Sequence, residues 1–161
     1  AEQMATDIVV DWGIGEWTDI EATKLMETRY SPIASPKLIA QHGPISDPST
    51  LTQHTLIHQH DRSEWRNWFE LAGHPNQVFN YEIVVIDSNV VQRSVKDGQG
   101  VALGVFPFLD GDVADGVLVK LFDIDLLPTR AYHLLTRVGA RKRKDIRAVC
   151  NWVEAEAAGV V

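Results

Sequence analysis

The sequence predicts an α/β fold, and three observations support this prediction. Short runs rich in β-branched and aromatic residues alternate along the chain with short helical runs, a pattern typical of α/β proteins with largely parallel sheets. Glycine, proline and helix-capping residues separate most of these runs. The length of 161 residues suits one domain or two small lobes with a buried core.

Strand-forming composition recurs throughout the chain. A polar turn that holds Gly13 and Gly15 follows the first strand, and turn or capping residues bound most of the others. The predicted strands cover residues 7–12, 24–34, 55–59, 78–87, 100–108, 116–122 and 131–137.

Two short helices are predicted in the first third of the chain from their start signals. Ser35 precedes Pro36, which combines a capping side chain with a proline at the first helical position, and Gly43 lies near the end of this helix. Asp47 and Pro48 repeat the same start signal for a second brief helix.

Three longer helices follow. Asp61 is predicted to cap the first, which ends at Gly73, and Ser88 to cap the second, over residues 89–97. Cys150 lies in the last helix and is predicted to be a core thiol and not a nucleophile. The apolar faces are predicted to consist of Trp65, Trp68, Phe69 and Ala72 in the first of these helices, and of Ile146, Val149, Cys150 and Val153 in the last.

Charge and cysteine content restrict the classes of partner. A net charge of −7 disfavours a nucleic-acid surface on this chain, so any DNA contact is expected elsewhere. One cysteine excludes an internal disulfide and fits a reducing, cytoplasmic setting, and no apolar run is long enough to indicate a membrane partner. The basic residues that cluster near the last helix are interpreted as a solvated face: Arg137, Arg141, Lys142, Arg143, Lys144 and Arg147.

A dense group of histidines, His54, His58 and His60, raises the possibility of a zinc site. His58 and His60 lie two apart on a predicted strand and would share a face, whereas nothing in the spacing directs His54 toward them. Zinc requires three or four converging ligands, so we expect no metal site here. No G-x-S-x-G or H-E-x-x-H motif occurs either, and we expect neither an enzyme nor a cofactor.

The junction of Asp87, Ser88 and Asn89 has two interpretations. It follows a predicted strand and begins a helix, which is where open α/β sheets bind ligands through free helix amides. Simple capping of the helix explains the same residues equally well.

The order of these segments resembles the effector-binding domain of LysR-type transcriptional regulators, in the subgroup that contains the glycine-cleavage activator and the β-lactamase regulator. The resemblance covers nearly the whole chain. It rests on ATDIVVDWGIGEW, RYSPIASPKLIAQHGPISDPSTLTQHTLIH, DRSEWRNWFELAG, IDSNVVQRSVKDGQGVALGVFPFL and AYHLLTR.

The resemblance implies a type 2 periplasmic-binding-protein-like fold, in which two α/β subdomains joined by two crossover strands enclose a small-molecule cleft. Residues 1–30 and 131–161 would form the first subdomain and residues 31–130 the second. We expect the first subdomain to be incomplete. DNA would be read only through an N-terminal helix-turn-helix that this chain lacks.

The family pattern also implies which residues bind the effector. Asp11 stands where the subgroup commonly has an arginine, so the charge of the ligand is not fixed by the resemblance. The residues expected to contact the ligand are Tyr30, Ser31, Ser88, Asn89, Phe106, Pro107 and Tyr132.

The expected function is therefore small-molecule sensing and oligomerisation, most simply as a dimer, by part of a cytoplasmic LysR-type regulator. Two alternatives remain open at this point. The chain could be a free-standing solute-binding protein, or a metal-dependent enzyme that uses His54, His58 and His60.

Overall fold

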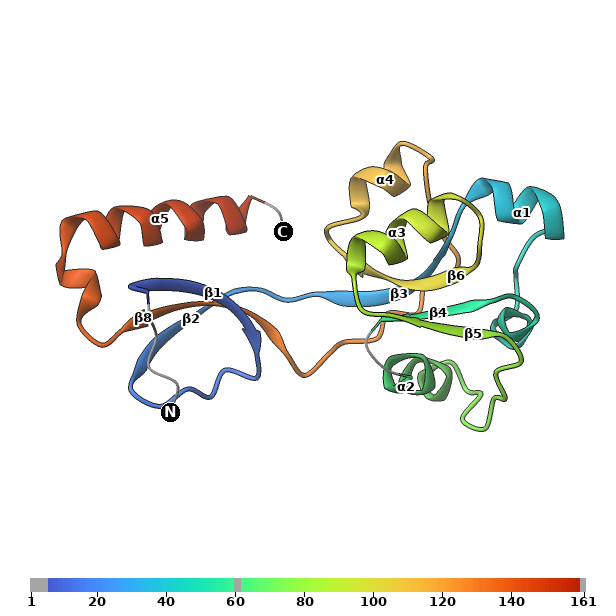
Figure 1. Ribbon diagram of the computed structural model, residues 1–161, viewed down its shortest axis with the longest axis horizontal. Helices are drawn as coiled ribbons and strands as arrows, with labels where there is room; N and C mark the ends of the chain where they lie inside the picture. Colours follow the sequence, from blue (N-terminus) through green and yellow to red (C-terminus); the bar gives the residue numbers. More distant parts are fainter. Residues whose placement is uncertain (1–5, 60–61, 160–161) are drawn as a thin grey trace. The chain divides into compact units, whose positions relative to one another are not determined.

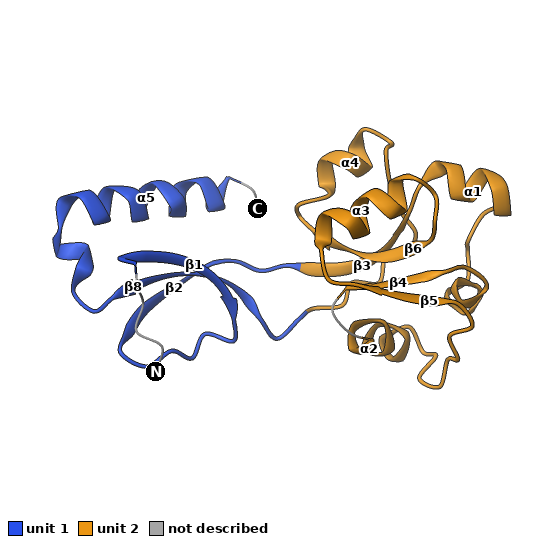
Figure 2. Ribbon diagram, in the orientation of Figure 1, with its two compact units in different colours: residues 1–28, 128–161 blue, residues 29–127 orange. Residues whose placement is uncertain are grey.

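The computed structural model describes residues 6–59 and 62–159, and the chain divides into two compact units. Unit 1 contains residues 1–28 and 128–161, and unit 2 contains residues 29–127 (Figure 2). Each unit has its own sheet and its own buried core.

Unit 1 is a three-stranded sheet with one covering helix. The strand order is β1 (Ile8–Gly13), β8 (Ala131–Arg137) and β2 (Ile20–Met26), and both outer strands are antiparallel to β8. The short 3₁₀-helix η2 (Ala140–Lys142) leads into α5 (Lys144–Ala158), which lies along one face of this sheet (Figure 1). Apolar residues of β8 and α5 form the core between them: Leu134, Ile146 and Cys150.

Unit 2 contains a five-stranded mixed sheet with the order β5-β4-β6-β3-β7. β4 is parallel to β5 and to β6, whereas β3 is antiparallel to β6 and to β7. The expectation of largely parallel sheets is therefore wrong outside the β5-β4-β6 group. The strands are β3 (Arg29–Ala34), β4 (Leu56–Gln59), β5 (Glu82–Val85), β6 (Val101–Phe106) and β7 (Val119–Lys120).

The helices of unit 2 are α1 (Pro36–His42), η1 (Pro48–Gln53), α2 (Ser63–Leu71), α3 (Ser88–Lys96) and α4 (Asp110–Ala114). The predicted caps of the two short helices, α1 and η1, are confirmed, because each capping side chain accepts a hydrogen bond from a backbone amide of the first turn. The Ser35 hydroxyl accepts from the Leu38 amide at 3.3 Å, and the Asp47 carboxylate accepts from the Ser49 amide at 2.8 Å.

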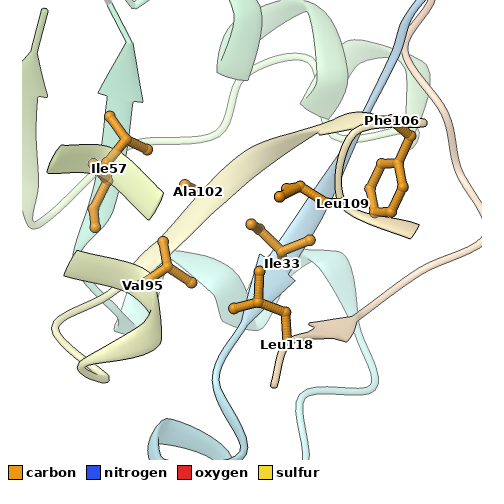
Figure 3. Close-up of a cluster of buried hydrophobic side chains, with 8 residues drawn as sticks. Ile33, Ile57, Val95, Ala102, Phe106, Leu109 and Leu118 are labelled. Carbon is orange, nitrogen blue, oxygen red and sulfur yellow. The ribbon is translucent and has the colours of Figure 1, made fainter. Parts of the chain in front are cut away.

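Opposite faces of this sheet are covered by α2 and α3 (Figure 1). The predicted aromatic face of α2 is confirmed, since Trp65, Trp68 and Phe69 are all buried. On the other face, Val91 and Val95 of α3 pack against the sheet. The cluster in Figure 3 comprises Ile33, Ile57, Val91, Val95, Ala102, Phe106, Leu109 and Leu118.

Three predicted strands differ from the observed ones. The run 24–34 is two strands, because Glu27 and Thr28 separate β2 of unit 1 from β3 of unit 2. The run 78–87 forms a strand only over Glu82–Val85. These residues pair with β4, which is itself only four residues long. β7 pairs only with the last two residues of β3, which limits the predicted strand 116–122 to Val119–Lys120.

Two details of the predicted helices also differ. The predicted cap Asp61 lies outside the described residues. In α5, Ile146 and Cys150 are buried as expected, but Val149 is 45% exposed. The sheet beneath α5 has only three strands, and the core cluster it forms with the helix does not extend to Val149.

The close approach of β6 to the segment before β4 gives a stability prediction. A Cβ atom at Gly100 would lie 2.4 Å from the Thr55 carbonyl oxygen, which also accepts a hydrogen bond from the Val101 amide. We expect Gly100→Ala to lower the free energy of unfolding by about 1–3 kcal/mol, because backbone must shift to admit the methyl group.

Gly111 is the matched control for this substitution. It lies in α4, and a Cβ atom there would meet nothing within 4 Å. Gly111→Ala should leave stability unchanged or raise it by about 0.4–1 kcal/mol. Urea unfolding of both variants measures the difference, and equal stabilities would contradict the proposed backbone clash.

Candidate functional site

One edge of the unit 2 sheet gathers the predicted ligand-binding residues of that unit. The parallel strands β4, β5 and β6 all end at this edge. β3 begins there, because it is antiparallel to β6 and pairs Arg29 with Phe106. In open α/β sheets, ligands bind at the carboxyl ends of strands, so this edge is the candidate site of unit 2.

The loop after β5 turns directly into α3, and Asp87 caps this helix. Its carboxylate accepts from the Asn89 amide at 2.8 Å, and its carbonyl accepts from the Val91 amide at 3.1 Å. The prediction that Ser88 is the cap is therefore wrong, because the preceding residue already has the extended backbone that a capping position requires.

Ser88 and Asn89 occupy the exposed first turn of α3. Because Asp87 caps the start of α3, the Ser88 hydroxyl is not needed for this role. The Ser88 and Val90 amides belong to the first turn, where amides have no partner within the helix. These groups can donate hydrogen bonds to a ligand, although the Asp87 carboxylate offsets part of the positive end of the helix dipole.

The predicted residues on β3 lie within the protein. Ser31 is fully buried, and its hydroxyl donates to the Phe122 carbonyl at 3.1 Å and the Ile124 carbonyl at 3.3 Å. The backbone of Tyr30, which is also buried, exchanges two hydrogen bonds of 2.8 Å with Leu126. These residues join β3 to the segment that follows β7.

Phe106 and Pro107 end β6 at the same edge. Phe106 is buried in the core cluster, Pro107 is half-buried, and the peptide bond between them is cis. Buried Tyr30, Ser31 and Phe106 therefore underlie the edge, while Ser88 and Asn89 are its exposed predicted residues.

Tyr132 lies in unit 1, on the central strand β8. It is half-buried and opposite Trp12 of β1, with the two ring centroids 4.8 Å apart. Asp11, which precedes this tryptophan, is exposed and accepts a hydrogen bond from the Trp12 amide at 2.8 Å.

His54 and His58 have different surroundings. His58 is buried, with its Nε2 3.3 Å from a carboxylate oxygen of Glu82, whose other oxygen is 2.8 Å from the Arg62 guanidinium. The half-buried ring of His54 instead lies against the ring of His42, and His60 is outside the described residues. Among residues 6–59 and 62–159, no three histidine, cysteine, aspartate or glutamate side chains are placed to share a metal ion.

The pairing of the two rings affects the protonation of His54. Partial burial lowers the pKa of its imidazole, and the charge of His42 lowers the pKa further. His54 is thus held toward its neutral form.

Sequence reasoning missed two polar residues near the sheet edge. A narrow cavity at the end of β4 is lined by Ile57, His58, Gln59, Glu64, Trp65, Val91 and Leu103. Gln59 is the last residue of β4, so the rule that ligands bind at carboxyl ends of strands would have drawn attention to it. Glu64 carries no such signal, because its position depends on how α2 packs.

No helix in the described part of the chain is long and apolar enough to cross a membrane.

Two curated relatives are transcriptional regulators. The glycine cleavage system transcriptional activator of Escherichia coli K12 is 27% identical over 152 residues, which are 94% of this chain and 50% of that protein. The HTH-type transcriptional activator AmpR of Rhodobacter capsulatus is 32% identical over 127 residues, 78% of this chain and 42% of that protein. The chain thus spans about half the length of the curated relatives it matches.

Solved structures of effector domains have the same fold. The effector domain of AmpR from Pseudomonas aeruginosa superimposes with a TM-score of 0.80 at 27% identity, over 94% of this chain and 72% of that one. The AmpR effector-binding domain from Citrobacter freundii gives a TM-score of 0.81 at 21% identity, over 95% of this chain and 75% of that one. Both support the type 2 periplasmic-binding-protein-like fold.

The sequence model of the LysR substrate binding domain family matches residues 2–158, which is nearly the entire sequence. Together with the fold of both units, this match establishes that the chain belongs to the LysR substrate binding domain family.

Proposed function

We propose that this chain is the effector-sensing part of a cytoplasmic LysR-type transcriptional regulator and not an enzyme. The family match over residues 2–158 is the observation that carries this proposal. The two curated relatives are transcriptional activators about twice as long as the matched segment. The net charge of −7 makes this chain a poor surface for DNA, so DNA reading is assigned to a helix-turn-helix outside this sequence.

The two compact units are proposed to be the two subdomains of such a sensor. We place their boundaries at residues 30/31 and 130/131, as the resemblance implies. The division into units 1–28 with 128–161, and 29–127, supports this assignment.

A small polar effector is proposed to bind the sheet edge of unit 2 at Ser88 and Asn89. The first turn of α3 offers a hydroxyl, a side-chain amide and backbone N–H groups, all at the surface. Helix amides favour an anionic group, but the Asp87 carboxylate beside them opposes a net negative charge. A ligand with both a carboxylate and a cationic group, such as an amino acid, satisfies both features.

The remaining predicted contacts stay part of the proposal with different roles. Four residues are proposed to support the sheet edge from within unit 2: Tyr30, Ser31, Phe106 and Pro107. Tyr132 of unit 1 is proposed as an aromatic contact of the effector. The Tyr132 hydroxyl is the group to test, because a phenylalanine preserves the ring packing on Trp12.

The effector proposal is tested by a thermal-shift screen of amino acids and small carboxylates, followed by calorimetry on any compound that raises the melting temperature. We expect Ser88→Ala to weaken binding by about 0.5–1.5 kcal/mol, or roughly twofold to tenfold, through loss of one hydrogen bond. Tyr132→Phe should weaken binding by a similar amount, and its melting temperature without ligand verifies that the variant is folded.

Ser46→Ala is the control, because Ser46 is exposed and lies before η1, at the opposite edge of the sheet where β4 begins. Its affinity should equal that of the wild type. If Ser88→Ala and Tyr132→Phe also bind with wild-type affinity, the effector site is misplaced even though the family assignment stands.

The proposed homodimer has a candidate surface at the edge strand β5. Among the described residues, only β4 pairs with this strand, so its outer backbone groups lack a strand partner in that part of unit 2. Apolar side chains are exposed here and in the adjoining α3 segment: Ile83, Val84, Ile86 and Val90. Burial of such a strip against a second copy would remove apolar surface from water.

We expect light scattering to show a dimer, and the double variant Ile83→Lys, Ile86→Lys to shift it to monomer because charge is then buried at the interface. Val138→Lys is the control, since Val138 is 69% exposed, close to the 76% of Ile86, but lies in unit 1. A monomeric wild type at high concentration would contradict the dimer, whereas a dimeric double variant would contradict only this surface.

A further inference from the structure

A pocket in unit 2 brings together two histidines from neighbouring elements. His42 is the last residue of α1, and His54 follows the last residue of η1. Their ring centroids are 5.3 Å apart and their planes are nearly perpendicular, at 86°. His42 is exposed and His54 half-buried, so both rings are accessible to a solute.

The backbone holds both histidines in place. The Gly43 amide donates to the Ile39 carbonyl at 2.8 Å directly after His42, and the His54 amide donates to the Leu51 carbonyl at 3.0 Å. Polar side chains of Ser46, Thr50 and Gln53 line the pocket beside the rings. Each of these side chains has an oxygen that can contact a bound cation or its water.

We propose that His42 and His54 bind a divalent transition-metal ion, with water and pocket oxygens as the other ligands. A metal–nitrogen bond of about 2.0–2.1 Å places the ion about 3.2 Å from each ring centroid. Two such rings at a tetrahedral angle of about 110° have centroids roughly 5.2 Å apart. The observed separation of 5.3 Å is close to this value.

The donor set also indicates which metals bind and how tightly. Imidazole suits copper, nickel and zinc, with copper(II) expected to bind most tightly, whereas calcium and magnesium prefer sets of oxygen ligands. Two protein ligands are fewer than the four of a structural zinc site. The site should therefore exchange its metal readily and should not be required for folding.

The position of this site is independent of the proposed effector contacts. His42 and His54 lie on α1 and after η1, whereas Ser88 and Asn89 begin α3. Failure of one proposal therefore leaves the other unaffected. It also differs from the His54, His58 and His60 group, because His58 is engaged with Glu82.

The test is calorimetric titration of the chelator-treated chain with ZnCl₂ and with NiCl₂ at neutral pH. We expect one saturable site, and a loss of affinity of about tenfold or more in His42→Gln and in His54→Gln, because each removes one of two imidazole ligands. His74→Gln is the control, since His74 is not among the pocket residues. Thermal unfolding without metal verifies that each variant is folded.

Histidine NMR spectra provide the second measurement. Paramagnetic Ni²⁺ should broaden the ring signals of His42 and His54 at lower metal concentrations than those of His74 and His133. The proposal is overturned if the wild type shows no saturable binding. It is equally overturned if both glutamine variants retain wild-type affinity, which would leave the ring pair as an aromatic contact only.

Discussion

The packing of α2 against the β3 side of unit 2 is anchored at one backbone acceptor, the carbonyl of Ile124. It accepts hydrogen bonds from the Trp68 indole at 2.9 Å and from the Ser31 hydroxyl at 3.3 Å. One oxygen thus joins α2, β3 and the segment that follows β7. A buried indole without a partner costs about 1–3 kcal/mol, so Trp68 needs this acceptor, whereas the Ser31 hydroxyl also has the Phe122 carbonyl at 3.1 Å.

A second indole bond extends the same constraint to the parallel strands. The Trp65 indole donates to the Ile57 carbonyl at 3.1 Å, which fixes α2 beneath β4. With α2 in place on one face and Val91 and Val95 of α3 packed on the other, the loop between β5 and α3 is confined to the sheet edge. The exposed position of Ser88 and Asn89 therefore follows from packing on both faces of the sheet.

Features that depend on neighbours in the chain could be predicted from the sequence, and those that depend on distant neighbours could not. The Ser35 and Asp47 caps, the aromatic face of α2 and the bounds of β8 follow local rules. The length of β5 depends on its partner β4, whose paired residues lie 26 positions earlier in the chain, and no local pattern encodes it. Asp87 and Ser88 are both good capping residues, and only the backbone decides between them.

In the candidate site, too, features set by local sequence could be predicted, whereas contacts between distant residues could not. Strand-to-helix order and family resemblance led to the prediction of Ser88 and Asn89 as ligand contacts. They gave no sign that Ser31 is buried, with its hydroxyl donating to carbonyls more than 90 residues away. The contact between His54 and His42 was likewise hidden, because a loop and a 3₁₀-helix separate them. Sequence periodicity carries no information on such pairs.

The proposed effector site lies at the edge of unit 2 where α3 begins. Amide NMR spectra of the chain, recorded during titration with a compound that raises its melting temperature, test this claim most directly. We expect the largest saturable shifts at the amides of Ser88, Asn89 and Val90, because these groups begin α3. Saturable shifts confined to other parts of the chain, with residues 88–90 unmoved, would contradict it.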